Sequence, residues 1–455
     1  MIKGREDEIA TLLERLFPIN RSLTGDGNRE TLRILQELIP LKILEYPAGK
    51  SVFDWTIPDE WHIRNAWVKD LSGRKIVDFS NTPLHVVAYS EAVHLELTAE
   101  ELLPRLHVLE RMPDAIPYRT SYYERSWGFC VSKEQYETIR NSTDRLEVMI
   151  DAQFDPNGSM SLGEVYIPGE RPEEYLVSTY ICHPFMANDN LSGVVCAALW
   201  AREMLKIDPP KFSWRFVFAP ETIGAIAYLF YNQNSLPLIQ GAFVLSCCGG
   251  PGPLGYKASF LGNSSVDRAM EAAFREKSID PIRYPFTPFG SDERQFSSPG
   301  FRIPTVSVTK NKYHEYDEYH TSKDNLDFVN GPQIEESLDV YLEIAKILET
   351  NETLRSLNPW GEPQLGRRKL YSNRGGAFLQ PGAAGTEDAK GETKFADVEA
   401  MIWLLFFADG DHDLVTISEK SNITFSRLLT ASKVLLESDL LENSENKTAE
   451  LGLPV

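Results

Sequence analysis

The chain has 455 residues, of which 42% are hydrophobic and 25% charged, an ordinary composition for a globular protein of about two or three domains. Its 46 Lys and Arg against 66 Asp and Glu give a net charge of −20, which disfavours nucleic acid and anionic membranes as partners. The five cysteines are odd in number and irregularly spaced, so they predict no disulfide framework. Neither a signal peptide nor a membrane span is recognisable, and we expect a cytoplasmic protein.

The N-terminal region begins with two helical patterns, at residues 5–17 and 27–38, separated by the sequence NRSLTG. The character of the chain then changes over residues 42–130. Short β-rich runs alternate there with Pro and Gly turns, which predicts a small inserted β-rich domain. We therefore expect the main domain to be formed by residues 1–41 and 131–365.

The main domain alternates apolar strand patterns with helical patterns, an order typical of an α/β fold built around a central mixed sheet flanked by helices. The predicted strands are 145–152, 175–181, 213–219, 241–247 and 303–309, and the predicted helices are 191–206, 222–235, 264–277 and 332–349.

The C-terminal region begins with a predicted linker at 366–390, rich in small residues and turn formers. Residues 391–455 then contain three helical patterns, at 395–407, 415–421 and 424–438, which we interpret as a winged helix-turn-helix domain. Five basic residues stand against twelve acidic ones in this domain, so we expect no DNA binding. A docking or dimerisation module fits better, which leaves open a homo-oligomer formed through this domain or the inserted one.

Polar residues follow the predicted strands of the main domain where each strand ends. His183 and Asp189 follow strand 175–181, Glu221 follows strand 213–219, and His320 follows the last strand. Ligands of open α/β sheets bind beyond such strand ends, and a His/His/carboxylate set is a common catalytic zinc site with a free carboxylate nearby as general base. Each residue alone also has an ordinary explanation, since Asp189 and Glu221 precede helices and would suit helix caps.

The order of these residues resembles the M28-type zinc aminopeptidases. In that family a His precedes a D-N-x-S-G segment, followed by E-E-x-G, S-D-H and H-T segments; the matching residues here are His183, Asp189-Asn190-Leu191-Ser192-Gly193, Glu221-Thr222-Ile223-Gly224, Ser291-Asp292 and His320-Thr321. The resemblance implies an aminopeptidase-like fold, a metal-bridging role for the Asp and a general-base role for the first Glu.

Over residues 5–440 or so, the chain resembles a bacterial branch of M28-like proteins associated with polysaccharide biosynthesis. That branch carries an inserted β-rich domain and a C-terminal winged helix. The segments that carry this likeness are 20–25 (NRSLTG), 53–58 (FDWTIP), 116–123 (IPYRTSYY) and 291–295 (SDERQ).

Three departures from the family pattern concern the metal. Thr222 replaces the second Glu, and Cys247 or Cys248 replaces a later metal-binding Asp. Glu293 stands in place of the His of the S-D-H segment. Two divalent cations about 3.5–4 Å apart need those carboxylates, so we expect one zinc ion. Its expected ligands are the residues aligned with the family's ligands, His183, Asp189 and His320, and Cys247 as a fourth ligand stays open.

The sequence thus predicts a metal-dependent hydrolase of the aminopeptidase type, with Glu221 as general base. The expected substrate is a small amide, a peptide or an amino-sugar conjugate. The expected substrate-binding residues are Asp292, Arg119, Tyr122 and Arg294, with Tyr123 nearby, although packing between domains would equally explain the aromatic ones. The alternative, favoured by Thr222 and Cys247, is a degenerate member that binds a ligand or partner without hydrolysis.

Overall fold

The computed structural model describes residues 4–368, 370 and 397–444. The chain divides into two compact units, the first formed by residues 1–267 and 281–342 and the second by residues 268–280 and 343–455. Helices α7 (Ser265–Glu276) and α9 (Gly331–Thr350) contain residues of both units. The predicted domain limits of 41, 130, 365 and 390 stay predictions, and residues 371–390 of the predicted linker lie outside the described residues.

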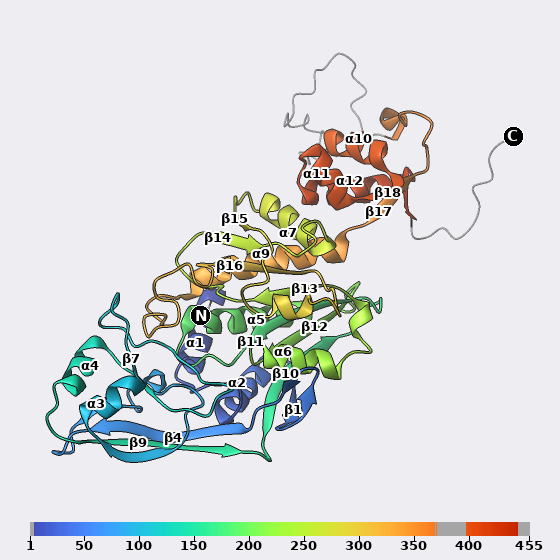
Figure 1. Ribbon diagram of the computed structural model, residues 1–455. Coiled ribbons are helices and arrows are strands. Elements are labelled where there is room, and N and C mark those ends of the chain that lie inside the picture. Colours follow the sequence, from blue (N-terminus) through green and yellow to red (C-terminus); the bar gives the residue numbers. More distant parts are fainter. Residues whose placement is uncertain (1–3, 369, 371–396, 445–455) are drawn as a thin grey trace. The chain divides into compact units, whose positions relative to one another are not determined.

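The first unit is built around an eight-stranded mixed sheet with the order β1-β10-β12-β11-β13-β16-β14-β15 (Figure 1). Strand β11 pairs in parallel with β12 and β13, and β13 with β16, whereas β1 and β10 add antiparallel neighbours. The strands are β1 (Lys42–Pro47), β10 (Ser159–Ile167), β11 (Glu174–Tyr180), β12 (Ser213–Ala219), β13 (Ile239–Leu245), β14 (Leu254–Lys257), β15 (Ile282–Tyr284) and β16 (Thr305–Lys310). The predicted mixed α/β fold is confirmed.

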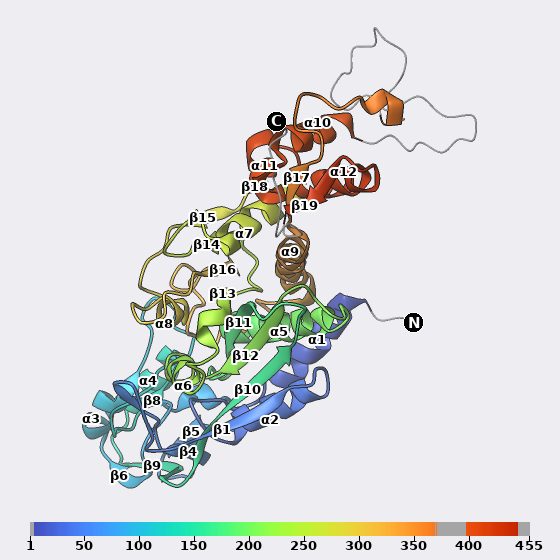
Figure 2. The same ribbon diagram turned by 90° about the vertical axis from the view of Figure 1, so that its right-hand side faces the viewer.

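Helices cover this sheet, as Figure 2 shows from the side. They are α1 (Arg5–Leu16), α2 (Asp26–Gln36), α5 (Gly193–Met204), α6 (Ile223–Tyr231) and the short α8 (Glu293–Phe296). Trp200 of α5 is fully buried and packs against Trp214 of β12, Phe243 of β13 and Tyr341 of α9. Every residue of β11 is buried, as expected for a strand with helices on both faces.

A second, four-stranded antiparallel sheet has the order β5-β4-β9-β6, and it includes a strand that we had expected in the central sheet. Its strands are β4 (Glu60–Lys69), β5 (Lys75–Asp78), β6 (Val93–Leu97) and β9 (Leu146–Asp155), and the strand predicted at 145–152 is β9. The prediction that this strand belongs to the central sheet was wrong. Buried and more exposed residues alternate along β9, which suits an antiparallel sheet with one covered face.

Short elements complete this region. They are the hairpin strands β2 (Ser51–Val52) and β3 (Trp55–Thr56), the pair β7 (Leu106–His107) and β8 (Phe129–Cys130), and helices α3 (Ala99–Leu102) and α4 (Lys133–Arg140).

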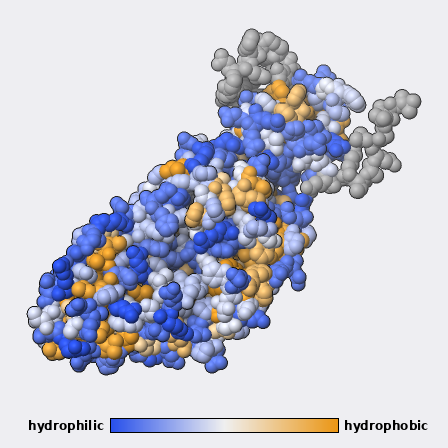
Figure 3. Space-filling model, in the orientation of Figure 1, coloured by the Kyte–Doolittle hydropathy of each residue, from blue (hydrophilic) through white to orange (hydrophobic). Residues whose placement is uncertain are grey.

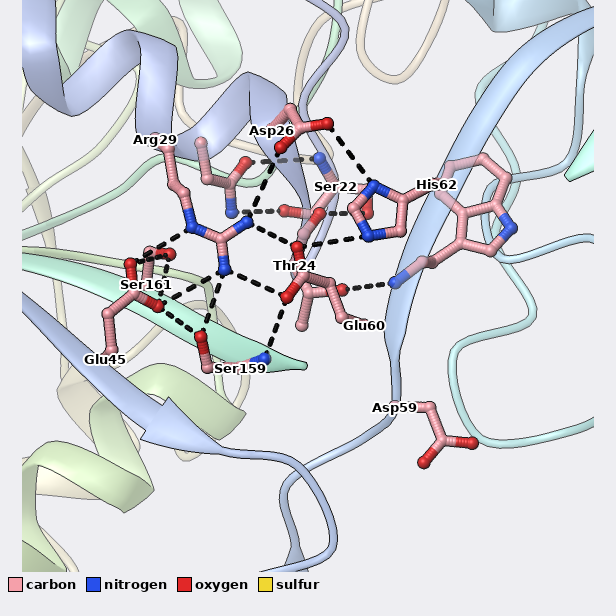
Figure 4. A network of polar contacts seen from close by, with 12 residues as sticks. Ser22, Thr24, Asp26, Arg29, Glu45, Asp59, Glu60, His62, Ser159 and Ser161 are labelled. Atoms are coloured by element: carbon pink, nitrogen blue, oxygen red, sulfur yellow. Dashed lines mark hydrogen bonds and ion pairs between the residues drawn. The ribbon is translucent and has the colours of Figure 1, made fainter. Parts of the chain in front are cut away.

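A polar network joins α2 to the small sheet (Figure 4). Arg29 of α2 makes ion pairs with Glu60 of β4 and Glu45 of β1. The Glu60 carboxylate also accepts the backbone N–H of Ser159 at 2.8 Å. Thr24, from the NRSLTG segment, accepts the backbone N–H of Trp61 at 2.9 Å. The NRSLTG segment therefore helps to fix the small sheet on the main one.

The second unit confirms the predicted winged helix. Helices α10 (Val398–Phe407), α11 (Leu414–Ser421) and α12 (Phe425–Glu437) pack on a three-stranded sheet with the order β18-β17-β19. Its strands are β17 (Thr353–Ser356), β18 (Asp409–Asp413) and β19 (Leu441–Asn443). Strand β17 precedes the predicted linker, whereas β18 and β19 follow it, so this sheet contains strands from both sides of the linker.

The surface seen in Figure 3 carries several separate apolar patches within a largely hydrophilic face. Among the described residues, none of the helices combines the length and apolar character that crossing a membrane requires.

Candidate metal centre

Three potential metal ligands meet beyond the carboxyl end of β11. His183 follows this strand, Asp189 lies in the irregular turn η3 (Ala187–Ser192), and His320 lies in the loop after β16. One ligand atom from each lies within 4.8 Å of the other two. Asp189 Oδ2 and His320 Nε2 form a close pair 2.9 Å apart, and neither atom makes a hydrogen bond to any other described residue. A carboxylate oxygen and imidazole nitrogens that converge in this way suit a cation such as zinc.

The backbone around these ligands is held by further buried groups. Asp324, fully buried, accepts the backbone N–H groups of Asn188 and Asp189 at 2.5 and 2.9 Å. Burial raises the pKa of Asp324 to about 7, although these N–H groups act against the rise. Arg21, from the NRSLTG segment, donates from Nε to the carbonyl of His183 at 3.0 Å. The position of the ligands thus depends on segments far apart in the chain.

The second oxygen of Asp189 has a different partner. Tyr180, the last residue of β11, donates its hydroxyl to Asp189 Oδ1, and the same hydroxyl lies 2.7 Å from Ser246 Oγ. Only Oδ2 therefore faces His320, while Oδ1 is engaged by a phenol.

Burial sets the charge state of the ligands. It lowers the pKa of His183 to about 4, so this imidazole is neutral near pH 7 and keeps a lone pair for a metal. Burial alone would raise the pKa of Asp189, but His183 and His320 outweigh it and lower that pKa to about 2. The cluster thus presents an ionised carboxylate beside a neutral imidazole.

Two further carboxylates lie next to the ligands. Glu221, which follows β12, has Oε2 3.9 Å from His183 Nε2. Burial, followed by the charges of Asp292 and Asp189, raises its pKa well above the usual range. Asp292 is buried and accepts the backbone N–H of Thr222 at 2.7 Å, and burial raises its pKa to about 7. Carboxyl groups with raised pKa values are suited to proton transfer.

The residues that depart from the family pattern have other partners. Cys247 is fully buried beside Tyr313 and Tyr316, and burial raises the pKa of its thiol well above the usual range. A neutral thiol is a poor metal ligand, and Cys247 is not part of the convergent cluster. Glu293 forms a buried ion pair with Lys257 at 2.5 Å.

The expected substrate-binding residues lie in different places. Arg294 donates to Thr222 Oγ1 at 3.3 Å, and its charge lowers the pKa of Glu221 and Asp292 against the larger effect of burial. Arg119 is exposed, and among the described contacts its charge acts on His107 and Cys130 rather than on the ligand cluster.

Tyr118 is a residue that the sequence analysis did not assign. Its ring lies 5.3 Å from that of His183 and 5.2 Å from that of His320, and its hydroxyl contacts that of Tyr122. Its backbone N–H donates to the carbonyl of His320 at 2.8 Å. The only signal in the sequence was its membership of segment 116–123.

A second group of potential ligands, Asp26, Glu60 and His62, lies in the network of Figure 4. The guanidinium of Arg29 binds the Glu60 carboxylate through two nitrogens and lies 3.6 Å from Asp26. A fixed positive charge already neutralises this group, so it is a weaker candidate for a cation.

Comparison with known proteins agrees with this architecture. Residues 10–351 match a domain family of unknown function, DUF4910, and residues 352–443 match a winged helix-turn-helix family. A Clostridium acetobutylicum protein is 41% identical over 96% of both chains and is named for polysaccharide biosynthesis and an aminopeptidase-like domain. A crystal structure from the same organism, described as a peptidase, has 39% identity over 96% of both chains and a TM-score of 0.87.

More distant solved structures share the fold alone. A zinc aminopeptidase from Bacillus subtilis has a TM-score of 0.55 at 15% identity, covering 76% of this chain and 94% of its own. An M28 peptidase precursor from Shewanella amazonensis has a TM-score of 0.52 at 15% identity, covering 76% and 95%. The chain belongs to the DUF4910 family. Its main unit has the aminopeptidase-like fold of the M28 type, followed by a winged helix.

Proposed function

We propose that this protein is a metal-dependent hydrolase of small amide or peptide bonds, with zinc held by His183, Asp189 and His320. The observation that carries the proposal is the convergence of His183, Asp189 and His320, whose ligand atoms all lie within 4.8 Å of one another beyond the carboxyl end of β11. Asp189 Oδ2 and His320 Nε2 lie 2.9 Å apart and contact no third described polar group, so both are available to a cation that displaces the proton between them. The neutral state of His183 supports the same conclusion.

We further propose one zinc ion per chain rather than two. Asp189 Oδ1 already accepts the hydroxyl of Tyr180, which competes with a second metal ion for that oxygen. At the positions where two-metal relatives supply further carboxylates, this chain has Thr222 and the buried thiol of Cys247. The negative charge needed to hold two neighbouring divalent ions is therefore missing.

The bound zinc would supply Lewis acidity toward the amide carbonyl and lower the pKa of the attacking water. Glu221 accepts the water proton and returns it to the leaving amine, as general base and then general acid. Its raised pKa suits both tasks, and the positive charge of a zinc ion held by His183, Asp189 and His320 would favour the ionised form that must act first. Asp292, buried beside Thr222, holds the substrate amine or a proton in transit.

The substrate class follows from the chemistry of the site together with the named relative. Two carboxyl groups next to the ligands, the buried Asp292 and the partly exposed Glu221, suit a substrate with an amine close to the scissile amide. The Clostridium acetobutylicum relative is named for polysaccharide biosynthesis, which favours an amino-sugar or peptidyl conjugate as the substrate. We propose that the protein acts in the cytoplasm.

A second candidate function is binding without hydrolysis. The specific observation in its favour is that Thr222 and Cys247 stand where carboxylates are expected, which removes charge from the site. Metal content and hydrolysis of a panel of aminoacyl amides, measured on wild-type protein purified without chelator, separate the two functions. Near one zinc per chain with amide hydrolysis supports the enzyme. Zinc without hydrolysis of any member of the panel favours the binding protein.

A further inference from the structure

We propose that Trp55 and Tyr123, both outside the central sheet, form a subsite that binds a flat apolar ring of the substrate. The inference rests on the proposed function, because it assigns the ring-binding part of the same site. A flat apolar ring is either an aromatic side chain or the C–H face of a sugar ring.

An unbroken series of aromatic contacts leads from the metal ligands to this pair. Tyr118 lies against the rings of His183 and His320, and its hydroxyl contacts that of Tyr122. Tyr122 packs against Tyr123 with ring centroids 6.2 Å apart, and Tyr123 packs edge-to-face on Trp55 at 5.1 Å. The series therefore connects the ligand cluster to the pair.

The two outer members of this series are far more exposed than the residue next to the metal ligands. Tyr118 is 4% exposed, whereas Tyr123 is 55% and Trp55 36% exposed. If these aromatic side chains served only to pack one sheet against the other, both sheets would cover them. Large aromatic side chains left open beside a cluster of titratable groups are instead typical of ligand sites.

The segment that carries Tyr123 is fixed on two sides. The backbone N–H of Ser322, next to the His320 loop, donates to the carbonyl of Ile116 at 2.9 Å, and Pro117 forms a bridge with Thr321. Further along, the N–H of Ser121 donates to the carbonyl of Ala88 at 3.0 Å. The distance from the metal ligands to the aromatic pair is thus set by backbone hydrogen bonds.

Trp55 is held by the hairpin of β2 and β3. Phe53, at the turn, packs against Phe230 and Phe301 with ring centroids 5.2 and 5.7 Å away. Phe230 lies at the C-terminal end of α6, so this anchor holds the hairpin against the end of the helix remote from Glu221. Tyr123 lies close enough to Glu221 and Asp292 for their charges to act on its hydroxyl group. One end of the subsite therefore lies near the proposed general base.

The test measures binding, so that it does not depend on turnover. The full chain carrying Glu221→Gln, and the same protein with Trp55→Ala, are titrated by calorimetry with L-phenylalaninamide, N-acetylglucosamine and L-alaninamide. We expect Trp55→Ala to weaken binding of at least one ring-bearing probe by about 3–10-fold, as the loss of one aromatic contact predicts, and L-alaninamide by less than about twofold. Loss with phenylalaninamide alone identifies an aromatic ring, and loss with N-acetylglucosamine alone identifies a sugar.

Two further variants make the result decisive. Trp55→Phe keeps a ring and should retain most of the affinity, which separates a lost contact from a damaged fold. Trp360→Ala removes a tryptophan of the second unit that is 90% exposed, and it should not change the affinity for any of the probes. Equal binding of both ring probes with and without Trp55, or no binding of either, would overturn the subsite even if the wild type hydrolyses amides. Ring binding without any wild-type hydrolysis would instead defeat the proposed function alone.

Discussion

Asp324 offers a sharp test of the candidate metal centre, because it holds the ligand loop without belonging to the ligands. Its carboxylate accepts the backbone N–H groups of Asn188 and Asp189, and the hydroxyl of Tyr316 at 3.0 Å. Asp324→Asn keeps one oxygen and replaces the other by an NH2 group that cannot accept an N–H. One hydrogen bond to a charged acceptor is lost, which costs about 1.5–3 kcal/mol of stability. Zinc affinity should fall about 10–100-fold, as for other residues that orient metal ligands.

The assay is competition for zinc with a chromophoric chelator at pH 8, above the pKa of about 7 of Asp324, alongside urea unfolding of the metal-free protein. Asp267→Asn is the matched control. Asp267 is 3% exposed and accepts the backbone N–H groups of Ser259 and Ser264 at 2.8 and 2.9 Å. The Asp267→Asn variant should lose about as much free energy of unfolding as Asp324→Asn, while its zinc affinity should stay at the wild-type value. Unchanged zinc affinity in Asp324→Asn, or an equal fall in the control, would refute the reasoning.

Three other predictions concern the metal, the base and the winged helix. Metal analysis should give about one zinc per chain in the wild type and none in His183→Ala or Asp189→Ala; a value near two would defeat the single-ion proposal. Glu221→Gln should lower kcat by about 10²–10⁴-fold while zinc content stays near one, and full activity would exclude it as general base. Since the pKa of Glu221 is raised, wild-type kcat/KM should fall as the pH falls and Glu221 becomes protonated. The full chain should not shift DNA at about 150 mM salt, because residues 391–455 carry a net charge of −7; tight, sequence-dependent binding would contradict this.

The sequence by itself located the four parallel strands that carry the site, together with the candidate metal cluster, but it did not reveal β10, β14 or β15 of the same sheet. Apolar runs and helical periodicity located β11, β12, β13 and β16 to within a few residues. The meeting of His183, Asp189, Glu221 and His320 followed from a general property of α/β sheets, since carboxyl ends of parallel strands lie at one edge. The resemblance to M28-type proteins added roles that spacing alone does not provide.

Only the tertiary structure decided how the side chains around that cluster are oriented and partnered. Tyr180 engages one oxygen of Asp189, and Tyr118 reaches both histidine rings from more than sixty residues away. The charge of Arg119 acts on His107 and Cys130 of the β7–β8 pair instead of on the ligands. Strand β9 joined the small sheet because its buried residues alternate. Periodicity shows that a side chain is buried, but the partner it meets depends on long-range packing, which no local pattern contains.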